Sequence, residues 1–258
     1  MTRLLSGVAL GAAALAAILF LSPLGLRLLA CLVAALAARE YIGVLHHNRR
    51  PPHVIPVILL VVVTCWWVSA TARGDVLALL LIGLSWLAAE VLFLGLTVDQ
   101  AAARFLAPWY IGMPLGMLVA IQTTGGRAAT LLLLATIVVS DSAQFYTGRL
   151  LGRRPLAPAI SPKKTIEGAI GGVVLATLFI VSIGPPLLPA ARRLPLALLG
   201  VAIVALGICG DLFESRLKRI AGVKDSSRII PGHGGILDRI DALLFATPAF
   251  YLYIQAGT

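Results

Sequence analysis

Long apolar runs, separated by short polar connections, make up most of the chain. Because an apolar helix needs about 20 residues to cross a bilayer, these runs predict about nine membrane-spanning helices. The predicted spans are residues 4–21, 23–38, 54–71, 76–96, 105–121, 128–146, 166–188, 194–213 and 241–255. The pattern therefore predicts an all-α, polytopic integral membrane protein.

The composition supports this class. Of the 258 residues, 59% are hydrophobic and 12% are charged, and the mean hydropathy is +0.98. A soluble domain is about half apolar and about a quarter charged, so a soluble enzyme is excluded. The net charge of +10 does not indicate nucleic-acid binding, because the basic residues lie in connections between apolar runs and form no known binding motif. A lipid surface and phosphorylated substrates fit this charge better.

Lysine and arginine are unevenly distributed among the connections. The N-terminus and the connections after the second, fourth, sixth and eighth spans carry most of them. Basic connections favour the cytoplasmic side, which predicts a cytoplasmic N-terminus and a C-terminus outside, in the inner (plasma) membrane of the cell. The two most charged connections, residues 140–172 and 211–241, then face the cytoplasm together. Both lie in a predicted C-terminal catalytic region, residues 126–258, which follows N-terminal transmembrane helices in residues 1–125.

The segment 211–241 carries an unusual density of charge for a chain of this kind. Its acidic residues are Asp211, Glu214, Asp225, Asp238 and Asp241, and its basic residues are Arg216, Lys218, Arg219, Lys224, Arg228 and Arg239. Carboxylates bind hard divalent cations, usually together with substrate phosphates, and arginines and lysines bind the phosphates themselves. The glycine-rich turn 231–235 allows backbone N–H groups to approach an anion. The segment therefore predicts a metal-assisted phosphate site at a membrane face.

The segment 140–172 offers a second set of polar groups. Asp141 ends a strongly apolar helix, where a carboxylate needs a partner or a water-filled cavity. Thr165 or Ser161 could cap the next helix, while Gly168, Gly171 and Gly172 favour close helix packing. Lys163 and Lys164 fit either a site or ordinary anchoring at the cytoplasmic face.

Glu90 is an acidic residue inside the fourth predicted span. It is a candidate partner for Arg104 or a residue of a polar cavity. A position at a helix end, with the carboxylate reaching toward water, is the other interpretation.

The run from Ser215 to Asp241 resembles the signature of the phosphatidate cytidylyltransferase family, also called CDP-diacylglycerol synthases. The run from Ser140 to Gly172 is similar to an upstream block of the same family. It has Ala143 where the family pattern has glycine, and Lys163 stands at a variable position. The resemblance covers residues 135 to 248.

The resemblance implies transfer of the cytidylyl group of CTP to phosphatidic acid, giving CDP-diacylglycerol and pyrophosphate. It also implies Mg²⁺, with or without a second ion such as K⁺, a homodimer in the bilayer, and a polar funnel open to the cytoplasm and to the lipid. A cytidylyltransferase for another lipid phosphate and an anion transporter are the alternatives. The D-G-x-x-A-R signature of CDP-alcohol phosphotransferases is absent.

The resemblance also implies roles for individual residues. Asp211 and Asp238 are the expected metal ligands, with Asp241 and Glu214 as further candidates. The expected catalytic residues are Asp211, Asp238, Lys224, Asp225 and Asp241. The expected substrate-binding residues are Ser215, Lys218, Arg219, His233, Gly234, Gly235 and Arg239, joined by Asp141, Lys164 and Glu167 from the upstream block.

Overall fold

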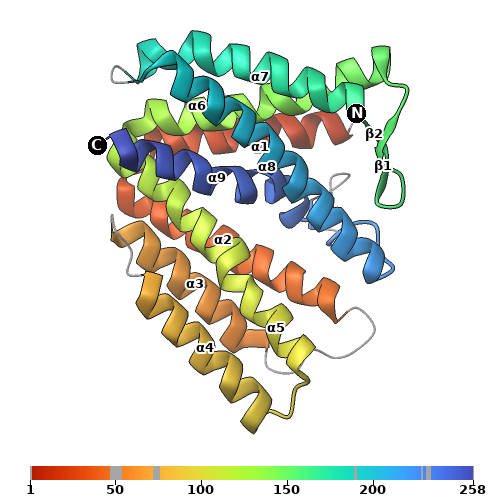
Figure 1. Cartoon of the computed structure of the whole chain (residues 1–258). Coiled ribbons are helices and arrows are strands. Elements are labelled where there is room, and N and C mark those ends of the chain that lie inside the picture. The colour runs from red at the N-terminus through yellow and green to blue at the C-terminus, as the bar shows by residue number, and fades with distance from the viewer. Residues whose placement is uncertain are drawn as a thin grey trace.

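The computed structural model of the protein describes residues 2–46, 54–71, 76–188, 191–227, 229–230 and 234–257. These residues form helices and one small hairpin (Figure 1). The helices are α1 (Thr2–Phe20), α2 (Pro23–Leu45), α3 (Val54–Ala70), α4 (Val76–Phe93), α5 (Val98–Ala107), η1 (Pro108–Gly112), α6 (Met113–Leu151), α7 (Ile166–Leu187), α8 (Arg193–Ile220) and α9 (Leu237–Gly257). The strands are β1 (Pro155–Ala157) and β2 (Ser161–Thr165).

Several helices are long and apolar enough to cross a membrane. Within the described residues, 4 candidate spans meet criteria of length and hydropathy: Pro23–Leu45, Val98–Leu151, Ile166–Leu187 and Arg193–Ile220. Gly7–Phe20, Val54–Ala70 and Leu77–Phe93 are shorter apolar helices. Large apolar side chains are exposed on the surface of the bundle, among them Phe20 and Phe93 at 81% and 83%. Such a surface suits lipid better than water, and the prediction of a helical membrane protein is confirmed.

The helices bounding the two charged segments extend beyond their predicted ends. The sixth and eighth spans were expected to end at residues 146 and 213, but α6 continues to Leu151 and α8 to Ile220. Hydropathy ends a predicted span where charge begins, whereas a helix continues through charged residues that have good helix propensity. Residues 147–151 and 214–220 of the two charged segments therefore lie on helices rather than in connections.

The expected purely helical architecture also needs one correction. Residues 155–165 form an antiparallel hairpin, with Pro155 paired to Thr165 and Ala157 to Ser161. Prolines at positions 155, 158 and 162 lack the N–H that a helix interior requires. A short hairpin with a turn satisfies this sequence better than a helix.

The predicted fifth and sixth spans belong to one nearly continuous helical segment. It begins at a capping box formed by Thr97 and Gln100, and it passes through the π-helical turn η1. Gly126 interrupts it with φ 77° and ψ 177°, a backbone conformation that suits glycine because it has no Cβ. This break coincides with the predicted boundary between residues 125 and 126.

The apolar core joins the two predicted parts of the chain. One buried cluster combines α2, α3 and η1 with Leu237 and Leu244 of α9. Alanines 34, 37 and 38 of α2 are fully buried in it, and such small residues allow helices to approach closely. The N-terminal helices therefore pack directly on the start of α9, where the signature segment ends.

A buried ion pair joins α4 to α5. Arg104 Nε lies 3.2 Å from Glu90 Oε1, and both side chains have no exposed surface. This confirms Arg104 as the partner of Glu90, one of the two roles that the sequence left open.

The charged ends of the helices gather on one side of the molecule. In Figure 1 the hairpin, the C-terminal end of α8 and the start of α9 lie toward the same side, and the two chain ends lie on opposite sides. This arrangement agrees with an odd number of crossings. It brings both charged segments to one end of the bundle.

Candidate active site

One face of the last two turns of α8 is polar. Glu214, Ser215 and Lys218 follow Asp211 by three, four and seven residues, which places all four on one face. Ser215 Oγ donates to Asp211 Oδ1 at 3.2 Å, and the Lys218 ammonium pairs with Glu214. The helix thus presents two acidic groups, a hydroxyl and a basic group on one face.

The turn after α8 is built by a glycine. Gly222 has φ 73°, its N–H donates to Arg219 O, and the N–H of Val223 donates to Lys218 O. This pair of bonds is the Schellman motif, which ends a helix and satisfies its last carbonyl groups. It directs the following residues, 223–227, back toward α2 and α9.

Asp238 organises the residues around it. Its Oδ2 accepts from Ser226 N at 2.9 Å, Ser226 Oγ at 2.8 Å and Gly235 N at 2.7 Å, and its Oδ1 accepts from Lys218 Nζ at 2.5 Å. These contacts, one of them from the Lys218 ammonium, favour the charged form of the carboxylate.

A glutamate that the sequence analysis missed holds the same turn from the other side. Glu40 of α2 is 4% exposed, it accepts hydrogen bonds from Ser227, Ile236 and Leu237, and its Oε2 lies 3.1 Å from Ser226 Oγ. Only its position as a lone acid near the end of an apolar helix could have indicated a role. Its partners lie 186–197 residues away in the chain, beyond the reach of any local pattern.

The upstream segment meets α8 through an ion pair. Lys164 at the end of β2 pairs with Asp211, and the two side chains are 23% and 35% exposed. A cavity of about 340 Å³ opens beside this pair. It is lined by Asp141, Gln144, Phe145, Gly148, Arg149, Lys163, Lys164, Thr165, Gly168, Ala169 and Asp211. The structure thus places Asp141, Lys164 and Asp211 around one cavity, and their expected roles in binding stay predictions.

Thr165 and the glycines of α7 fix the geometry of this cavity. Thr165 caps α7 by accepting from Gly168 N at 3.1 Å, as expected. A Cβ on Gly168 would lie 2.8 Å from Gln144 O, and one on Gly172 would lie 2.5 Å from Gln144 Cγ. The predicted packing role of these glycines is confirmed, because only glycine lets α7 pack this closely against α6.

Glu167 holds the start of the hairpin. Its Oε2 accepts from the backbone N–H groups of Arg153 and Arg154 at 3.0 and 3.2 Å. These bonds keep the hairpin against the first turn of α7. The structure therefore gives Glu167 an architectural contact, and its expected contact with substrate stays a prediction.

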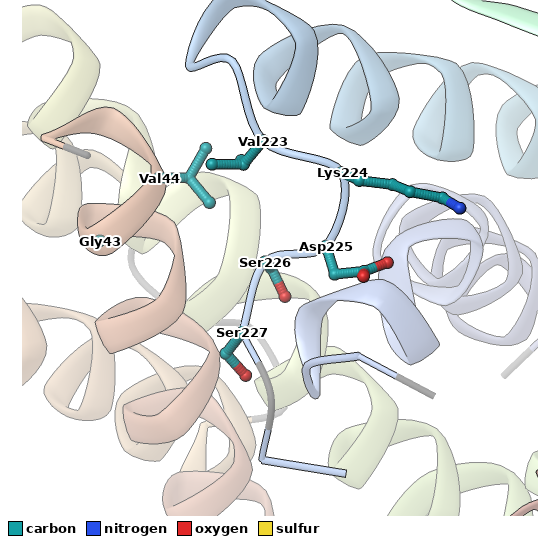
Figure 2. Close-up of a pocket in the computed structure, with 7 residues that line it drawn as sticks. All are labelled: Gly43, Val44, Val223, Lys224, Asp225, Ser226 and Ser227. Carbon is teal, nitrogen blue, oxygen red and sulfur yellow. The ribbon is translucent and has the colours of Figure 1, made fainter. Parts of the chain in front are cut away.

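The other candidate residues lie around the contacts of Asp238 and around the cavity beside Lys164 and Asp211. Asp241 interacts electrostatically with Asp211, Lys218 and Asp141, and its backbone packs on Gly210. Lys224 and Asp225 line a separate cavity of about 410 Å³ between residues 223–227 and the end of α2 (Figure 2). In Figure 2 both side chains extend away from α2. Arg219 and Arg239 are exposed, and His233 lies outside the described residues.

The arrangement of the carboxylates bears on the predicted metal site. Within the part of the chain that the structure describes, no three His, Cys, Asp or Glu side chains gather closely enough to hold a metal by themselves. Asp211 and Asp238 instead pair with different lysines, Lys164 and Lys218. The ligand roles of Asp211 and Asp238 stay predictions.

Taken together, the fold and the site define a helical membrane protein with a cluster of carboxylates and lysines at one end of its helices. The chain belongs to the cytidylyltransferase family, whose sequence profile matches residues 1–256.

Individual relatives agree with this assignment. The chain is 37% identical to a phosphatidate cytidylyltransferase of Helicobacter pylori strain J99, over 73% of this chain and 69% of that protein. It is 38% identical to one of Bacillus subtilis, over 61% of this chain and 60% of that protein. The uncharacterized protein YnbB of Escherichia coli is 44% identical over 58% of this chain and 48% of its own length. The matched region thus spans from about half to about two thirds of these relatives.

Proposed function

We propose that the protein transfers the cytidylyl group of CTP to phosphatidic acid, producing CDP-diacylglycerol and pyrophosphate for phospholipid synthesis. The observation that carries this proposal is the contact between Lys164 and Asp211, which joins the two signature segments at one cavity. Membership of the cytidylyltransferase family and the names of the relatives support the same reaction.

The transfer requires neutralisation of phosphate charge more than a covalent bond between the protein and the substrate. A phosphate oxygen of the lipid attacks the α-phosphorus of CTP in line, the bond to the β-phosphate breaks, and pyrophosphate leaves. Both reactants are anionic, so cationic groups must screen their repulsion and neutralise the leaving group. The exposed Arg219, Lys224 and Arg239 and the cavity residue Lys164 are the proposed phosphate-binding groups.

A divalent cation fits the carboxylates of this site. Mg²⁺ usually binds proteins through one or two carboxylates and completes its coordination with water and substrate phosphates. Asp211 lines the cavity and Asp238 pairs with Lys218, so both are carboxylates that can supply oxygen ligands, with Asp241 and Glu214 as further candidates. Mg²⁺ bound here would neutralise phosphate charge during the transfer. A second ion such as K⁺ belongs to the same proposal.

The proposed arrangement in the membrane has about nine crossings. Helices α1 to α4 form the first four, residues 98–125 and 127–151 form the next two, and α7, α8 and α9 complete the set. The cytoplasmic face of a bacterial inner membrane would then contain the hairpin and the signature turn. A funnel opening toward the lipid would let the acyl chains stay in hydrocarbon while the phosphate enters. The protein is also expected to act as a homodimer.

The test is a radiochemical assay on purified protein in mixed micelles with labelled CTP, Mg²⁺ and phosphatidic acid. We expect a labelled CDP-lipid, and we expect Asp238→Asn to abolish it. Asp99→Asn is the matched control, because Asp99 lies in the first turn of α5 and outside the proposed site, and it should retain full activity.

The outcomes separate the parts of the proposal. Absence of product from folded wild-type protein would exclude the enzyme assignment. Full activity of Asp238→Asn would exclude only its metal role. A product formed from another lipid phosphate, but not from phosphatidic acid, would assign the same chemistry to a different acceptor.

A further inference from the structure

A buried glutamate from the N-terminal part of the chain holds the turn between α8 and α9. Glu40 lies near the C-terminal end of α2 and is 4% exposed. Its Oε1 accepts from Ser227 Oγ at 2.6 Å and from Ile236 N at 3.0 Å. Its Oε2 accepts from Leu237 N at 2.8 Å and lies 3.1 Å from Ser226 Oγ. Each oxygen thus faces one serine hydroxyl and one backbone N–H.

These backbone groups belong to the start of α9. The N–H groups at the beginning of a helix have no acceptor within the helix, and a carboxylate there also interacts favourably with the helix dipole. Glu40 therefore caps α9 from a different helix. It fixes where the first turn of α9 begins relative to α2.

The residues that contact Glu40 also hold Asp238. Ser226 Oγ lies between the two carboxylates, 3.1 Å from Glu40 and 2.8 Å from Asp238. Gly235 passes between them as well, and a Cβ there would lie 2.4 Å from Glu40 Oε2. Any shift of Glu40 would therefore move groups that hold Asp238.

We propose that Glu40 is a positioning residue for the cytidylyl transfer proposed above. It acts through Ser226, Ser227 and the start of α9, and it sets the position of Asp238 without itself touching substrate. The inference rests on the proposed function for its kinetic consequence. Its structural consequence, a turn ordered by Glu40, is measurable without any activity.

Glutamine is the informative substitution. It keeps the length and volume of glutamate, but its amide has one oxygen and one NH₂ group. A serine hydroxyl can rotate to accept from that NH₂ group, whereas a backbone N–H cannot. In either orientation of the amide, the N–H of Ile236 or of Leu237 therefore faces another donor. Glu40→Gln should loosen the turn without emptying the core.

The experiment compares Glu40→Gln and Ser227→Ala with the control Glu90→Gln. Glu90 is also a buried glutamate of the N-terminal helices, but it pairs with Arg104 far along the chain from the turn. Hydrogen–deuterium exchange measures protection of the peptide covering residues 223–240. The lipid-product assay gives kcat and KM, and thermal unfolding in detergent gives the stability of each variant.

We expect Glu40→Gln to increase exchange at residues 223–240 and to lower kcat by about 10- to 100-fold, the range found when a group orienting a metal ligand is lost. The KM for phosphatidic acid should change little. Ser227→Ala should shift exchange and kcat in the same direction but less. Glu40→Asp, which keeps the carboxylate, should recover part of the activity. Glu90→Gln should lower the unfolding temperature without a selective change in the turn.

Wild-type exchange and wild-type kcat in Glu40→Gln would overturn the proposal. So would a loss of activity that follows the loss of thermal stability in the same way for Glu40→Gln and Glu90→Gln. If Glu40→Gln fails to fold, unchanged exchange and kcat in Ser227→Ala would overturn it. If the wild type makes no CDP-lipid, the proposed reaction fails, while the exchange data still decide whether Glu40 orders the turn.

Discussion

At the scale of single residues, Gly235 shows how little space the signature turn leaves. A Cβ at this position would lie 2.0 Å from Ser226 Oγ and 2.4 Å from Glu40 Oε2. Real Cβ atoms do not approach other atoms so closely, so an alanine must displace the serine, the glutamate or the backbone. All three hold Asp238 in place, and the hydrogen bond that the Gly235 N–H donates to Asp238 Oδ2 would be disturbed as well.

We predict that Gly235→Ala lowers the rate of CDP-lipid formation at least about tenfold while the protein stays folded. The reason is displacement of Asp238 rather than loss of the core. The matched control is Gly11→Ala in α1, where nothing lies within 4 Å of the added Cβ. That variant should keep its activity, and wild-type rates in Gly235→Ala would contradict the close packing of the turn.

At the scale of elements, the polar ends of α8 and α9 are held together by one close approach. A Cβ on Gly210 would lie 2.4 Å from the backbone oxygen of Asp241. No side-chain rotation relieves a clash with backbone, so the helices themselves would have to separate. One turn earlier on the same face, a Cβ on Gly207 would lie 3.6 Å from Ala242 Cβ, which is ordinary contact.

This pair of glycines provides a test of the helix contact. Gly210→Ala should destabilise the protein by about 1–3 kcal/mol, the usual cost of overpacking, and lower its activity. Gly207→Ala should be neutral or slightly stabilising, because alanine favours the helix. Thermal unfolding of both variants in the same detergent measures the difference. Equal unfolding temperatures would show that α8 and α9 do not meet as described.

The elements also show what a sequence reveals and what it does not. The apolar runs located the helices well, because length and hydropathy are local properties. They misplaced the ends of α6 and α8, because a helix continues through charged residues such as Glu214 and Lys218. The hairpin was missed, although its prolines were visible. The predicted N-cap at Thr165 is confirmed, and it was predictable because capping depends on residues only three positions apart.

At the scale of the whole molecule, the contacts that build the site connect distant parts of the chain. Lys164 meets Asp211, and this juxtaposition was predicted because two charged segments shared one predicted side of the membrane. Glu40 was not predicted, because its partners are separated from it by nearly the whole chain. A single sequence contains no signal for such a contact, and the structure supplies it.

The arrangement of the chain ends predicts a topology. We expect Ala159→Cys, at the turn of the hairpin, to react with a membrane-impermeant maleimide only from the cytoplasmic side. Ala256→Cys, exposed near the end of α9, should react only from the outside. Both are made in a Cys209→Ser background, because Cys31 and Cys65 are buried and Cys209 is exposed. Labelling of both positions from the same side would contradict an odd number of crossings.

The link between α2 and α9 also has a consequence for biosynthesis. When a ribosome has translated Glu40, its first hydrogen-bond donor, Ser226, is still 186 residues away in the chain. Until then, water at the membrane surface must solvate this carboxylate. A chain truncated before α9 would keep this buried acid without the backbone donors of Ile236 and Leu237.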